Sequence, residues 1–440
     1  MTRTATNTVL AALLAAGIPA QDPTPPRQPN VVVILSDDAG YGDFSMHGAT
    51  DLATPRIDSI AQGGVRCTNG YVSGPVCSPT RAGLMTGRYQ QRFGHELNIP
   101  PAWSETNGLP LEERTLAELM RAAGYRTHAL GKWHLGYADH FQPIARGFDH
   151  YWGFLQGARS YFPLAKTTRL NRILADRAPQ PEDFDYLTDE LGRQAAKAIA
   201  DRGDKPLFLY LAFNAVHAPM HATDKDLEGA EGPERRRRLI AMTRALDRAV
   251  GMVLDALDQA GIADDTLLFF LNDNGGAVNN ASRNGPLRGH KGQTFEGGIR
   301  VPFLARWPGH LPKGTVCDEP VIQLDIAATA LAAAGASPPT EHPLDGTDLL
   351  PHLRGDAKAP PHEALFWRFG DSWAIRMGAW KLVHQGDGAP MLFDLAHDIG
   401  EAADLAAKEP ERVKALQARF DAWARELAPP RWSMKGDDDK

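Results

Sequence analysis

The chain has 440 residues, 43% of them hydrophobic and 23% charged, which is typical of a globular protein in water. This length exceeds what one simple core accommodates, so we expect a large domain together with a smaller one. The formal net charge of -7 argues against a nucleic-acid partner, because phosphate binding depends on clustered Lys and Arg side chains.

The N-terminus has the pattern of a secretory signal peptide. Arg3 precedes an apolar stretch from Val9 to Ile18, and the small residue Ala20 follows. We therefore expect residues 1–20 to be a signal peptide, with a disordered tail as the alternative, and the protein to be exported to the periplasm or the medium. No apolar run is long enough to span a bilayer, so we expect no membrane anchor.

The cysteine content excludes a disulfide scaffold. The chain has three cysteines, Cys67, Cys77 and Cys317, and an odd number in an exported protein leaves one thiol to explain. If Cys77 is converted chemically into another group, two cysteines remain. Whether Cys67 and Cys317 pair stays open, because pairing depends on geometry.

Four short apolar segments are each followed by polar residues that suit metals or anions. The segments are Val31–Leu35, Tyr125–Leu130, Leu207–Phe213 and Leu267–Leu271. Continuous hydrophobicity of this kind predicts strands that are covered on both faces. The polar residues that follow are, in the same order, Asp37 and Asp38, Lys132 and His134, Asn214 and His217, and Asp273 and Asn274.

Helical patterns lie between these strands. One runs from Leu116 to Ala123 before Gly124, and another runs from Leu239 to Leu257 before Gly261. The alternation predicts an α/β fold, with a large, mixed, mostly parallel sheet sandwiched by helices. Ligands of such folds bind beyond the carboxyl ends of the strands, so the four polar clusters are expected to converge. The basic run from Arg235 to Arg238 follows Glu234 within a helical pattern and is expected to form a solvated helix face.

The C-terminal part has a different character. A helical stretch, Gln323–Ala334, and a Pro-rich segment, Ser337–Pro343, lead into four strand-like runs and a final amphipathic helix, Glu411–Leu427. The runs are Ala364–Arg368, Trp373–Met377, Trp380–His384 and Met391–Leu395, spaced like an antiparallel meander. We predict a catalytic domain at residues 29–345, a small α+β domain with an antiparallel sheet at 346–432, and a disordered tail at 433–440.

The four residues Asp37, Asp38, Asp273 and Asn274 supply only oxygen donors. Such a set favours a hard cation, calcium or alternatively magnesium, and calcium takes about six to eight oxygen ligands. A single Asp after a strand is often only a helix cap. Two such pairs at two strand ends favour a metal site, because clustered carboxylates without a cation repel one another and raise each other's pKa.

The segment Cys77-Ser-Pro-Thr-Arg81 opens a short helix that is expected to end at Gly87. Ser78 is the predicted N-cap and Pro79 the first helical residue. A group just before this N-terminus faces free N–H groups, and Arg81 adds a forked donor suited to a tetrahedral oxyanion. A lone cysteine is more often a buried, inert thiol. A cysteine-dependent phosphatase is another interpretation, but the loop from Cys77 to Arg81 is too short to wrap around a phosphate as it does in that class.

With these residues the sequence resembles the type I sulfatases of the alkaline phosphatase superfamily. Their hallmark, Cys-x-Pro-x-Arg followed by Thr-Gly-Arg, is matched by Cys77-Ser-Pro-Thr-Arg-Ala-Gly-Leu-Met-Thr-Gly-Arg88, with Thr80 in place of the usual Ser. Other matches, in order from about Pro29 to Trp307, are Asp37 to Asp43, Gly131 to Gly136, Gly147 to Asp149, His217 to Pro219, Asn272 to Gly276 and Lys291 to Pro302. So many ordered matches are more specific than one motif.

The resemblance implies an alkaline phosphatase-like fold and a set of chemical roles. A formylglycine-generating enzyme would oxidise Cys77 to formylglycine, whose hydrate attacks sulfur with one hydroxyl and eliminates sulfate with the other. Asp37, Asp38, Asp273, Asn274 and the modified Cys77 would hold one calcium ion. Lys291 and His217 would bind sulfate and protonate the leaving oxygen, His134 would help to deprotonate the second hydroxyl, and Arg81 and Lys132 would stabilise negative charge.

Each of these residues also has a purely structural interpretation. The lysines could be solvated loop residues and the histidines could be core residues, but all of them fall within matched segments. For His95, His128, His221 and His290 we expect structural roles or positions on the substrate rim.

The expected substrate is a sulfated carbohydrate of the galactose or N-acetylgalactosamine type. Gly87 to Glu96 and Gly147 to Phe154 resemble the branch of N-acetylgalactosamine-6-sulfatases and arylsulfatase A-like enzymes, which includes bacterial carbohydrate sulfatases. Sugar-stacking candidates are Tyr151, Trp152, Tyr161 and Phe162, and rim candidates are Arg159 and Ser160.

Three other functions are alternatives to this one. One is an arylsulfatase of broad specificity. Another is a phosphatase or phosphodiesterase of the same superfamily, which would use Ser or Thr and two metals; Cys77 and the small number of His and Asp residues in the matched segments argue against it. The third is a binding protein that keeps the fold while Cys77 stays a thiol.

Overall fold

A computed structural model describes residues 1–2, 5 and 28–433 of the chain. Its centre is a ten-stranded sheet in the order β11-β2-β10-β9-β1-β8-β4-β5-β6-β7. The strands are β1 (Asn30–Ser36), β2 (Val65–Cys67), β4 (Arg126–Lys132), β5 (His150–Phe154), β6 (Leu174–Ala175), β7 (Ala178–Pro179), β8 (Leu207–Ala212), β9 (Thr266–Asn272), β10 (Phe303–Arg306) and β11 (Thr315–Cys317). The five middle strands β9, β1, β8, β4 and β5 are parallel, whereas β10, β6 and β7 pair with antiparallel neighbours. The predicted mixed, mostly parallel sheet is confirmed.

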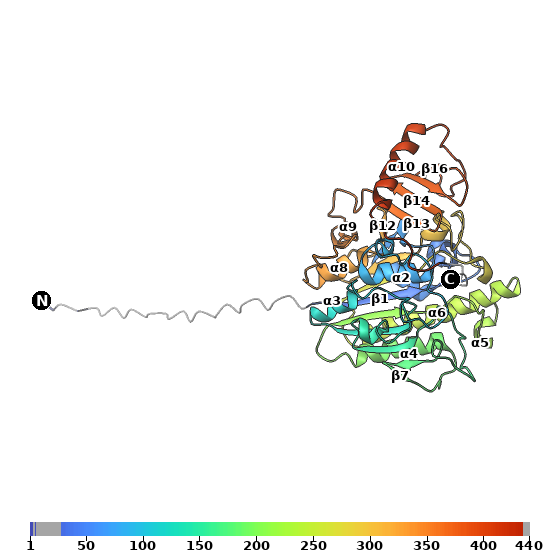
Figure 1. Cartoon of the computed structure of the whole chain (residues 1–440). Coiled ribbons are helices and arrows are strands. Elements are labelled where there is room, and N and C mark those ends of the chain that lie inside the picture. Colours follow the sequence, from blue (N-terminus) through green and yellow to red (C-terminus); the bar gives the residue numbers. More distant parts are fainter. Residues whose placement is uncertain (3–4, 6–27, 434–440) are drawn as a thin grey trace.

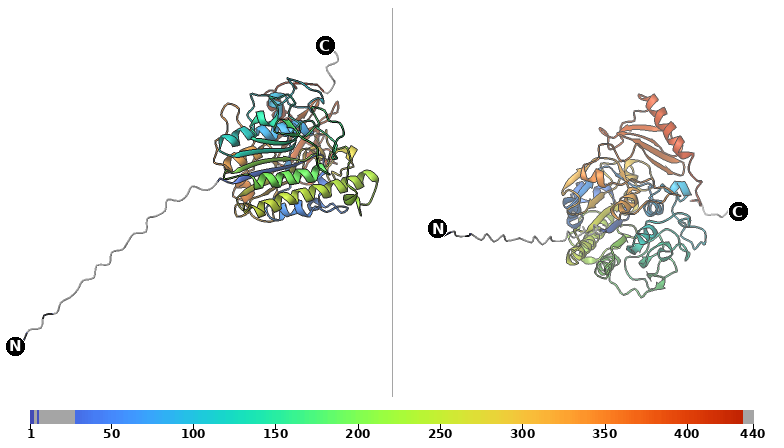
Figure 2. Two further views of the ribbon diagram at one scale, coloured as in Figure 1. Left: turned by 90° about the horizontal axis from the view of Figure 1, so that it is seen from below. Right: turned by 90° about the vertical axis from the view of Figure 1, so that its left-hand side faces the viewer.

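Helices cover both faces of this sheet (Figures 1 and 2). One layer contains α1 (Pro55–Gln62), α4 (Leu187–Ala200) and α6 (Glu234–Gln259), and the other contains α2 (Cys77–Thr86), α3 (Leu116–Ala122) and α8 (Asp325–Ala333). Shorter helices are α5 (Asp224–Leu227), α7 (Glu296–Ile299) and α9 (Leu350–Arg354).

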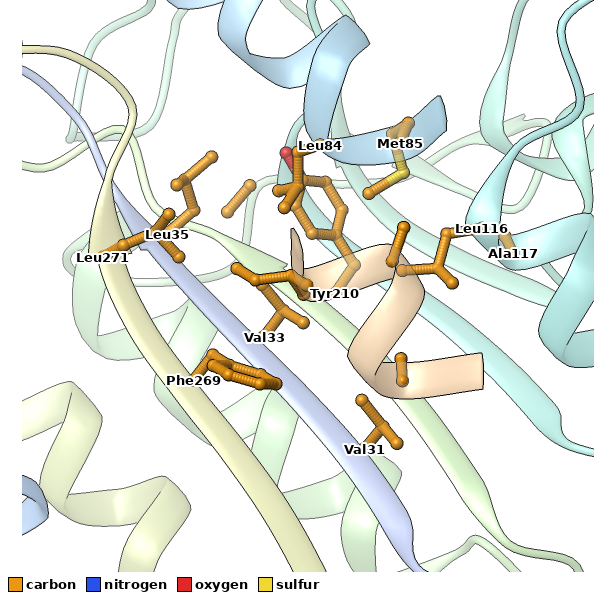
Figure 3. Close-up of a cluster of buried hydrophobic side chains, with 14 of the residues drawn as sticks. Val31, Val33, Leu35, Leu84, Met85, Leu116, Ala117, Tyr210, Phe269 and Leu271 are labelled. Atoms are coloured by element: carbon orange, nitrogen blue, oxygen red, sulfur yellow. The ribbon is translucent and has the colours of Figure 1, made fainter. Parts of the chain in front are cut away.

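Alternate residues of β1 pack against the two helical layers. Val31, Val33 and Leu35 face α2, α3 and α8 (Figure 3), while Val32 and Ile34 pack in the cluster that includes α4 and α6. Every residue of β1 is buried. This two-sided burial is why the strand is continuously apolar instead of alternating with polar residues.

The smaller C-terminal unit carries an antiparallel sheet, as predicted. Its four strands pair in chain order: β13 (Leu365–Phe369), β14 (Ser372–Met377), β15 (Trp380–His384) and β16 (Met391–Asp394). Helix α10 (Pro410–Ala424) packs beside this sheet (Figure 1). A two-stranded sheet of β3 (Gly70–Tyr71) and β12 (Val321–Ile322) lies in the larger unit. The residue limits given above for the two domains stay a prediction.

A buried ionic network joins the two units. Lys381 on β15 donates to Glu296 on α7 at 2.7 Å and to Glu401 at 2.9 Å, and all three side chains are fully buried. Glu401 also accepts the N–H of Glu296 at 2.7 Å. Tyr71 and Arg300 donate to the second oxygen of Glu296. The C-terminal sheet is therefore attached to the larger unit by charge pairing as well as by apolar packing.

The structure corrects two local predictions. Helix α2 begins at Cys77 with Val76 as its N-cap, because the Ser78 hydroxyl donates to the backbone oxygen of His134 instead of capping the helix. In the basic run, Arg236 is only 4% exposed and forms ion pairs with Asp43 and Asp51, so the run is not a uniformly solvated face.

Two predictions fall largely on residues that the structure does not describe. The signal peptide at 1–20 lies outside the described residues except for Met1, Thr2 and Ala5, and the tail at 433–440 lies outside them except for Ser433. Within the described part of the chain, no helix is both long and apolar enough to cross a membrane.

Candidate active site

The four predicted polar clusters meet at the carboxyl end of the sheet. Asp37 and Asp38 follow β1, Asp273 and Asn274 follow β9, Asn214 and His217 follow β8, and Lys132 is the last residue of β4 with His134 just beyond it. Helix α2 brings Cys77 and Arg81 to the same place, where the Cys77 sulfur lies 3.7 Å from Asp37 Oδ1. The topology of the sheet therefore assembles residues that are up to 254 positions apart, from Asp37 to Lys291.

Each buried carboxylate of the cluster has its own cation. Lys132 donates to Asp37, the Arg81 guanidinium binds Asp273 at 2.8 Å, and Lys291 Nζ lies 2.7 Å from Asp38 Oδ1. Burial alone would raise the pKa of Asp37, but Lys132, His217 and Arg81 hold that pKa below its usual range. Burial and the neighbouring Asp37 raise the pKa of Asp273. The positively charged side chains of Lys132, Arg81 and Lys291 are thus already in place at the centre, where they neutralise the buried carboxylates.

The donor atoms fit a hard divalent cation. Potential ligand atoms of Asp37, Asp38, Cys77 and His217 all lie within 4.8 Å of one another. Asn274 points its amide nitrogen at Asp38 Oδ1 at 2.8 Å, and its Oδ1 is buried without a hydrogen-bond partner among the described residues. A buried acceptor without a partner is costly, and a bound cation would satisfy it. Carboxylate and amide oxygens are the ligands that calcium and magnesium take.

Asn280 and Ser282 hold the loop after β1 in shape. Asp38 has a left-handed backbone with φ of 62°. Its backbone oxygen accepts the Asn280 amide at 3.0 Å and the Ser282 hydroxyl at 2.8 Å. Such a conformation is unfavourable for a residue with a side chain, so these bonds fix it. No signal in the sequence marks them, because their role depends on contacts about 240 residues away.

Cys77 is buried in a position where its thiol is a poor nucleophile. Its side chain belongs to the first turn of α2, the residue is 1% exposed, and Lys291 Nζ lies 3.3 Å from its sulfur. Burial raises the pKa of the thiol to about 12, against the opposing effect of Lys132 and Lys291. The unmodified thiol therefore stays protonated at neutral pH, although the surroundings are built for an anion.

The two histidines differ in access. His217 Nε2 lies 3.5 Å from Asp38 Oδ2, and its side chain is 20% exposed, so solvent reaches it. His134 is buried, and burial followed by the charges of Lys132 and Arg81 lowers its pKa well below the usual range. Its ring packs directly on Gly157, where a Cβ would lie 2.6 Å from Cε1. His134 is therefore a neutral imidazole held in one orientation.

The remaining candidates are held by contacts within the protein. His95 is buried against the Ser78 hydroxyl at 2.6 Å, and the hydroxyl also bonds the His134 backbone, so His95 supports the site from behind. Arg159 is buried in an ion pair with Glu182 at 2.7 Å. The other contacts are those of His221 Nδ1 with Ser160 Oγ, His290 Nδ1 with the Lys291 backbone oxygen, and the His128 ring with the His150 ring.

The other two cysteines lie together away from this centre. Cys67 and Cys317 are opposite each other on the parallel strands β2 and β11, where both are buried free thiols. They are thus neighbours, and in this structure they are not linked by a disulfide.

Comparisons with known proteins agree with this geometry. The sulfatase family model matches residues 29–336, and a model of the N-sulphoglucosamine sulphohydrolase C-terminal region matches residues 290–423. Human N-acetylgalactosamine-6-sulfatase is 33% identical over 89% of this chain and 84% of its own length. Bovine arylsulfatase A is 34% identical over 93% of this chain and 90% of its own length. The solved structure of Ps i-CgsB in complex with k-i-k-neocarrahexaose has a TM-score of 0.88 and 33% identity, covering 92% of this chain and 95% of that one.

The chain belongs to the sulfatase family. It is a sulfuric ester hydrolase with the alkaline phosphatase-like fold of that family, which confirms the resemblance seen in the sequence.

Proposed function

We propose that this protein removes sulfate from a sulfated carbohydrate, using a formylglycine made from Cys77 and one calcium ion. The observation that carries the proposal is the position of Cys77, buried between Lys291 and Asp37, with Lys132 and Arg81 paired to the carboxylates beside it. The thiol itself is protonated there, so a nucleophile of another kind suits the site better. A formylglycine-generating enzyme would be the maturation partner, and the pattern of residues 1–20 supports export.

The residues of the site would have the following roles in the reaction. Calcium would be held by Asp37, Asp38, Asp273 and Asn274 and would polarise a sulfate oxygen, while the formylglycine would supply the attacking hydroxyl. His217, the more exposed histidine, would hold the proton that the leaving sugar oxygen takes. Lys291 would turn from Asp38 to the sulfate. The neutral His134 would accept a proton from the hydroxyl that remains, and Arg81 and Lys132 would stabilise negative charge.

Removing the cation with a chelator is expected to inactivate the enzyme, and calcium should restore activity better than zinc. The reason is that the proposed ligands Asp37, Asp38, Asp273 and Asn274 supply only hard oxygens. The measurement is turnover of a sulfate ester before and after chelation, with elemental analysis of the purified protein. Stoichiometric zinc in active protein would contradict the assignment.

A carbohydrate substrate is supported by two relatives. N-acetylgalactosamine-6-sulfatase has an amino sugar in its name, and Ps i-CgsB was solved with a neocarrahexaose. Of the aromatic residues considered for stacking, Tyr151 and Tyr161 are buried core residues. Phe162 is 36% exposed and lies 5.9 Å from the His221 ring, close to the loop that carries His217. It is the better candidate for contact with a sugar ring.

The experiment that tests the substrate class compares specificity constants. We expect kcat/KM to be highest for sulfated galactose or N-acetylgalactosamine units, lower for glucosamine sulfates and lower again for aryl sulfates. Turnover of an aryl ester alone would decide nothing, because an activated leaving group needs little binding. A clear preference for the aryl ester over every sugar would favour the second candidate, an arylsulfatase of broad specificity, which the likeness to arylsulfatase A supports.

A further inference from the structure

A hollow of about 450 Å³ lies next to the reaction centre and is not used by the mechanism above. Its volume is within the range of small-molecule sites, about 300–1,000 Å³. One wall is formed by Ala218, Pro219 and Met220, which directly follow His217. Another wall is Asn279, and the third is the start of α6 with Glu234, Arg235 and Arg238.

The walls of this hollow are fixed to the reaction centre. Asn279 belongs to the short helix η5 (Val278–Asn280), whose Asn280 amide binds the backbone oxygens of Asp38 and Val216. The start of α6 is anchored by the buried Arg236, which pairs with Asp43 on the loop after β1. The hollow thus has a set position relative to the residue that faces the leaving oxygen, His217.

The charge of the hollow is positive. Arg238 is engaged by Glu234 at 2.9 Å and by the Met220 backbone oxygen at 3.2 Å. Arg235 is exposed and has no hydrogen-bond or ion-pair partner among the described residues. The hollow therefore carries one uncompensated guanidinium, in a chain whose formal net charge is -7. A free guanidinium is well suited to the oxygens of a sulfate or a carboxylate.

We propose that this hollow is a second subsite, which binds an anionic group on the sugar ring adjacent to the one that loses its sulfate. This inference rests on the proposed carbohydrate substrate. The leaving side of the ester faces His217, and the chain of sugars would continue past Pro219 toward Arg235. The shared chemistry is a ring that bears a sulfate ester or a uronic acid carboxylate, with Asn279 available for a hydroxyl.

The test uses galactose disaccharides that share the same reacting sulfate and differ only in the second ring, which is neutral, sulfated or a uronic acid. For the wild-type enzyme, kcat/KM should be higher with either anionic ring than with the neutral ring. In Arg235→Gln the ratio of anionic to neutral kcat/KM should fall by about tenfold, the size of one charge-assisted contact. Arg235→Lys should retain most of the ratio. Comparison of the sulfated disaccharide with the uronic acid disaccharide shows which anion the enzyme prefers.

Arg193→Gln is the matched control, because Arg193 is an exposed arginine on α4 whose ion pair among the described residues is with the nearby Glu190. It should leave the ratio unchanged. Added salt should reduce the preference of the wild-type enzyme and leave Arg235→Gln nearly unaffected. An unchanged ratio in Arg235→Gln, or an equal loss on all three disaccharides, overturns the subsite alone. If wild-type enzyme cleaves aryl sulfates but none of the disaccharides, the carbohydrate proposal fails and the subsite fails with it.

Discussion

Cys77→Ala is expected to abolish sulfate ester hydrolysis, with kcat reduced by at least about 10⁴-fold, as for the loss of other catalytic nucleophiles. The substitution removes one buried sulfur whose partners are Asp37 and Lys291, and it adds no volume to the helix. The fold should therefore survive, with an unchanged circular dichroism spectrum and a similar thermal midpoint. Initial rates on an aryl sulfate and on a sulfated sugar measure the effect.

Cys317→Ala provides the control for this variant. Cys317 is a second buried cysteine, but it lies on the edge strand β11, away from the reaction centre, so its loss should leave turnover intact. Mass analysis of the wild-type peptide that contains residue 77 should show sulfur replaced by oxygen together with the loss of two hydrogens, which is the mass of an aldehyde and not of a serine. Substantial turnover by Cys77→Ala, or full activity of protein whose residue 77 is an intact thiol, would refute the nucleophile assignment and revive the binding-protein alternative.

Lys381→Met should destabilise the protein by about 3–5 kcal/mol, the usual result of removing one partner from a buried ion pair. Methionine fills a similar volume, but Glu296 and Glu401 would then face each other in a buried site without their shared cation. Chemical denaturation followed by fluorescence measures the loss. Lys197→Met is the control, because Lys197 is 69% exposed and its pair with Asp201 lies in solvent, so its loss should change the free energy of unfolding little.

The loss caused by Lys381→Met should depend on pH in a definite direction. Burial already raises the pKa of Glu401 to about 7 in the wild-type protein, with Lys381 opposing this rise and Glu296 adding to it. Without Lys381 the pKa of Glu401 should rise further, because burial and the charge of Glu296 remain while the cation that opposed them is lost; Glu296 keeps its ion pair with Arg300. A buried carboxyl with a raised pKa destabilises the folded state most when it is ionised, at pH values above its folded pKa. It destabilises the folded state least at pH values below its unfolded pKa of 4.5. The stability gap to wild type should therefore narrow as the pH falls from 8 to 5, and a gap that widens would contradict the explanation.

Periodicity and position in the chain were sufficient to predict the sheet and the convergence of the site. The continuous apolar run of β1 and the acidic pair after it could be read directly, because both follow from local sequence. The meander of β13 to β16 was equally visible, since each strand is separated from the next by a short turn. The order of strands in the central sheet was not predicted, because pairing between distant segments leaves no local pattern.

The errors came where tertiary contacts override local preference. Ser78 has the chemistry of a helix cap, yet its hydroxyl bonds the His134 backbone, and α2 starts two residues earlier than predicted. Arg236 stands in a run of four arginines, and only the fold brings Asp43 and Asp51 to it. Arg159 was considered for the substrate rim, but Glu182 holds it inside. A residue's type indicates what it can bind, whereas the fold decides which partner it meets.

If Cys77 is converted to formylglycine as proposed, the burial of α2 sets an order of events during biosynthesis. All ten residues of this helix, Cys77 included, are buried in the folded protein. An oxidising enzyme that has to grasp the segment around Cys77 in an extended form could not reach it once the sheet and helices have packed. Conversion to formylglycine would then have to happen on the nascent or unfolded chain. On this basis, molecules that fold first are committed to remain inactive for their lifetime.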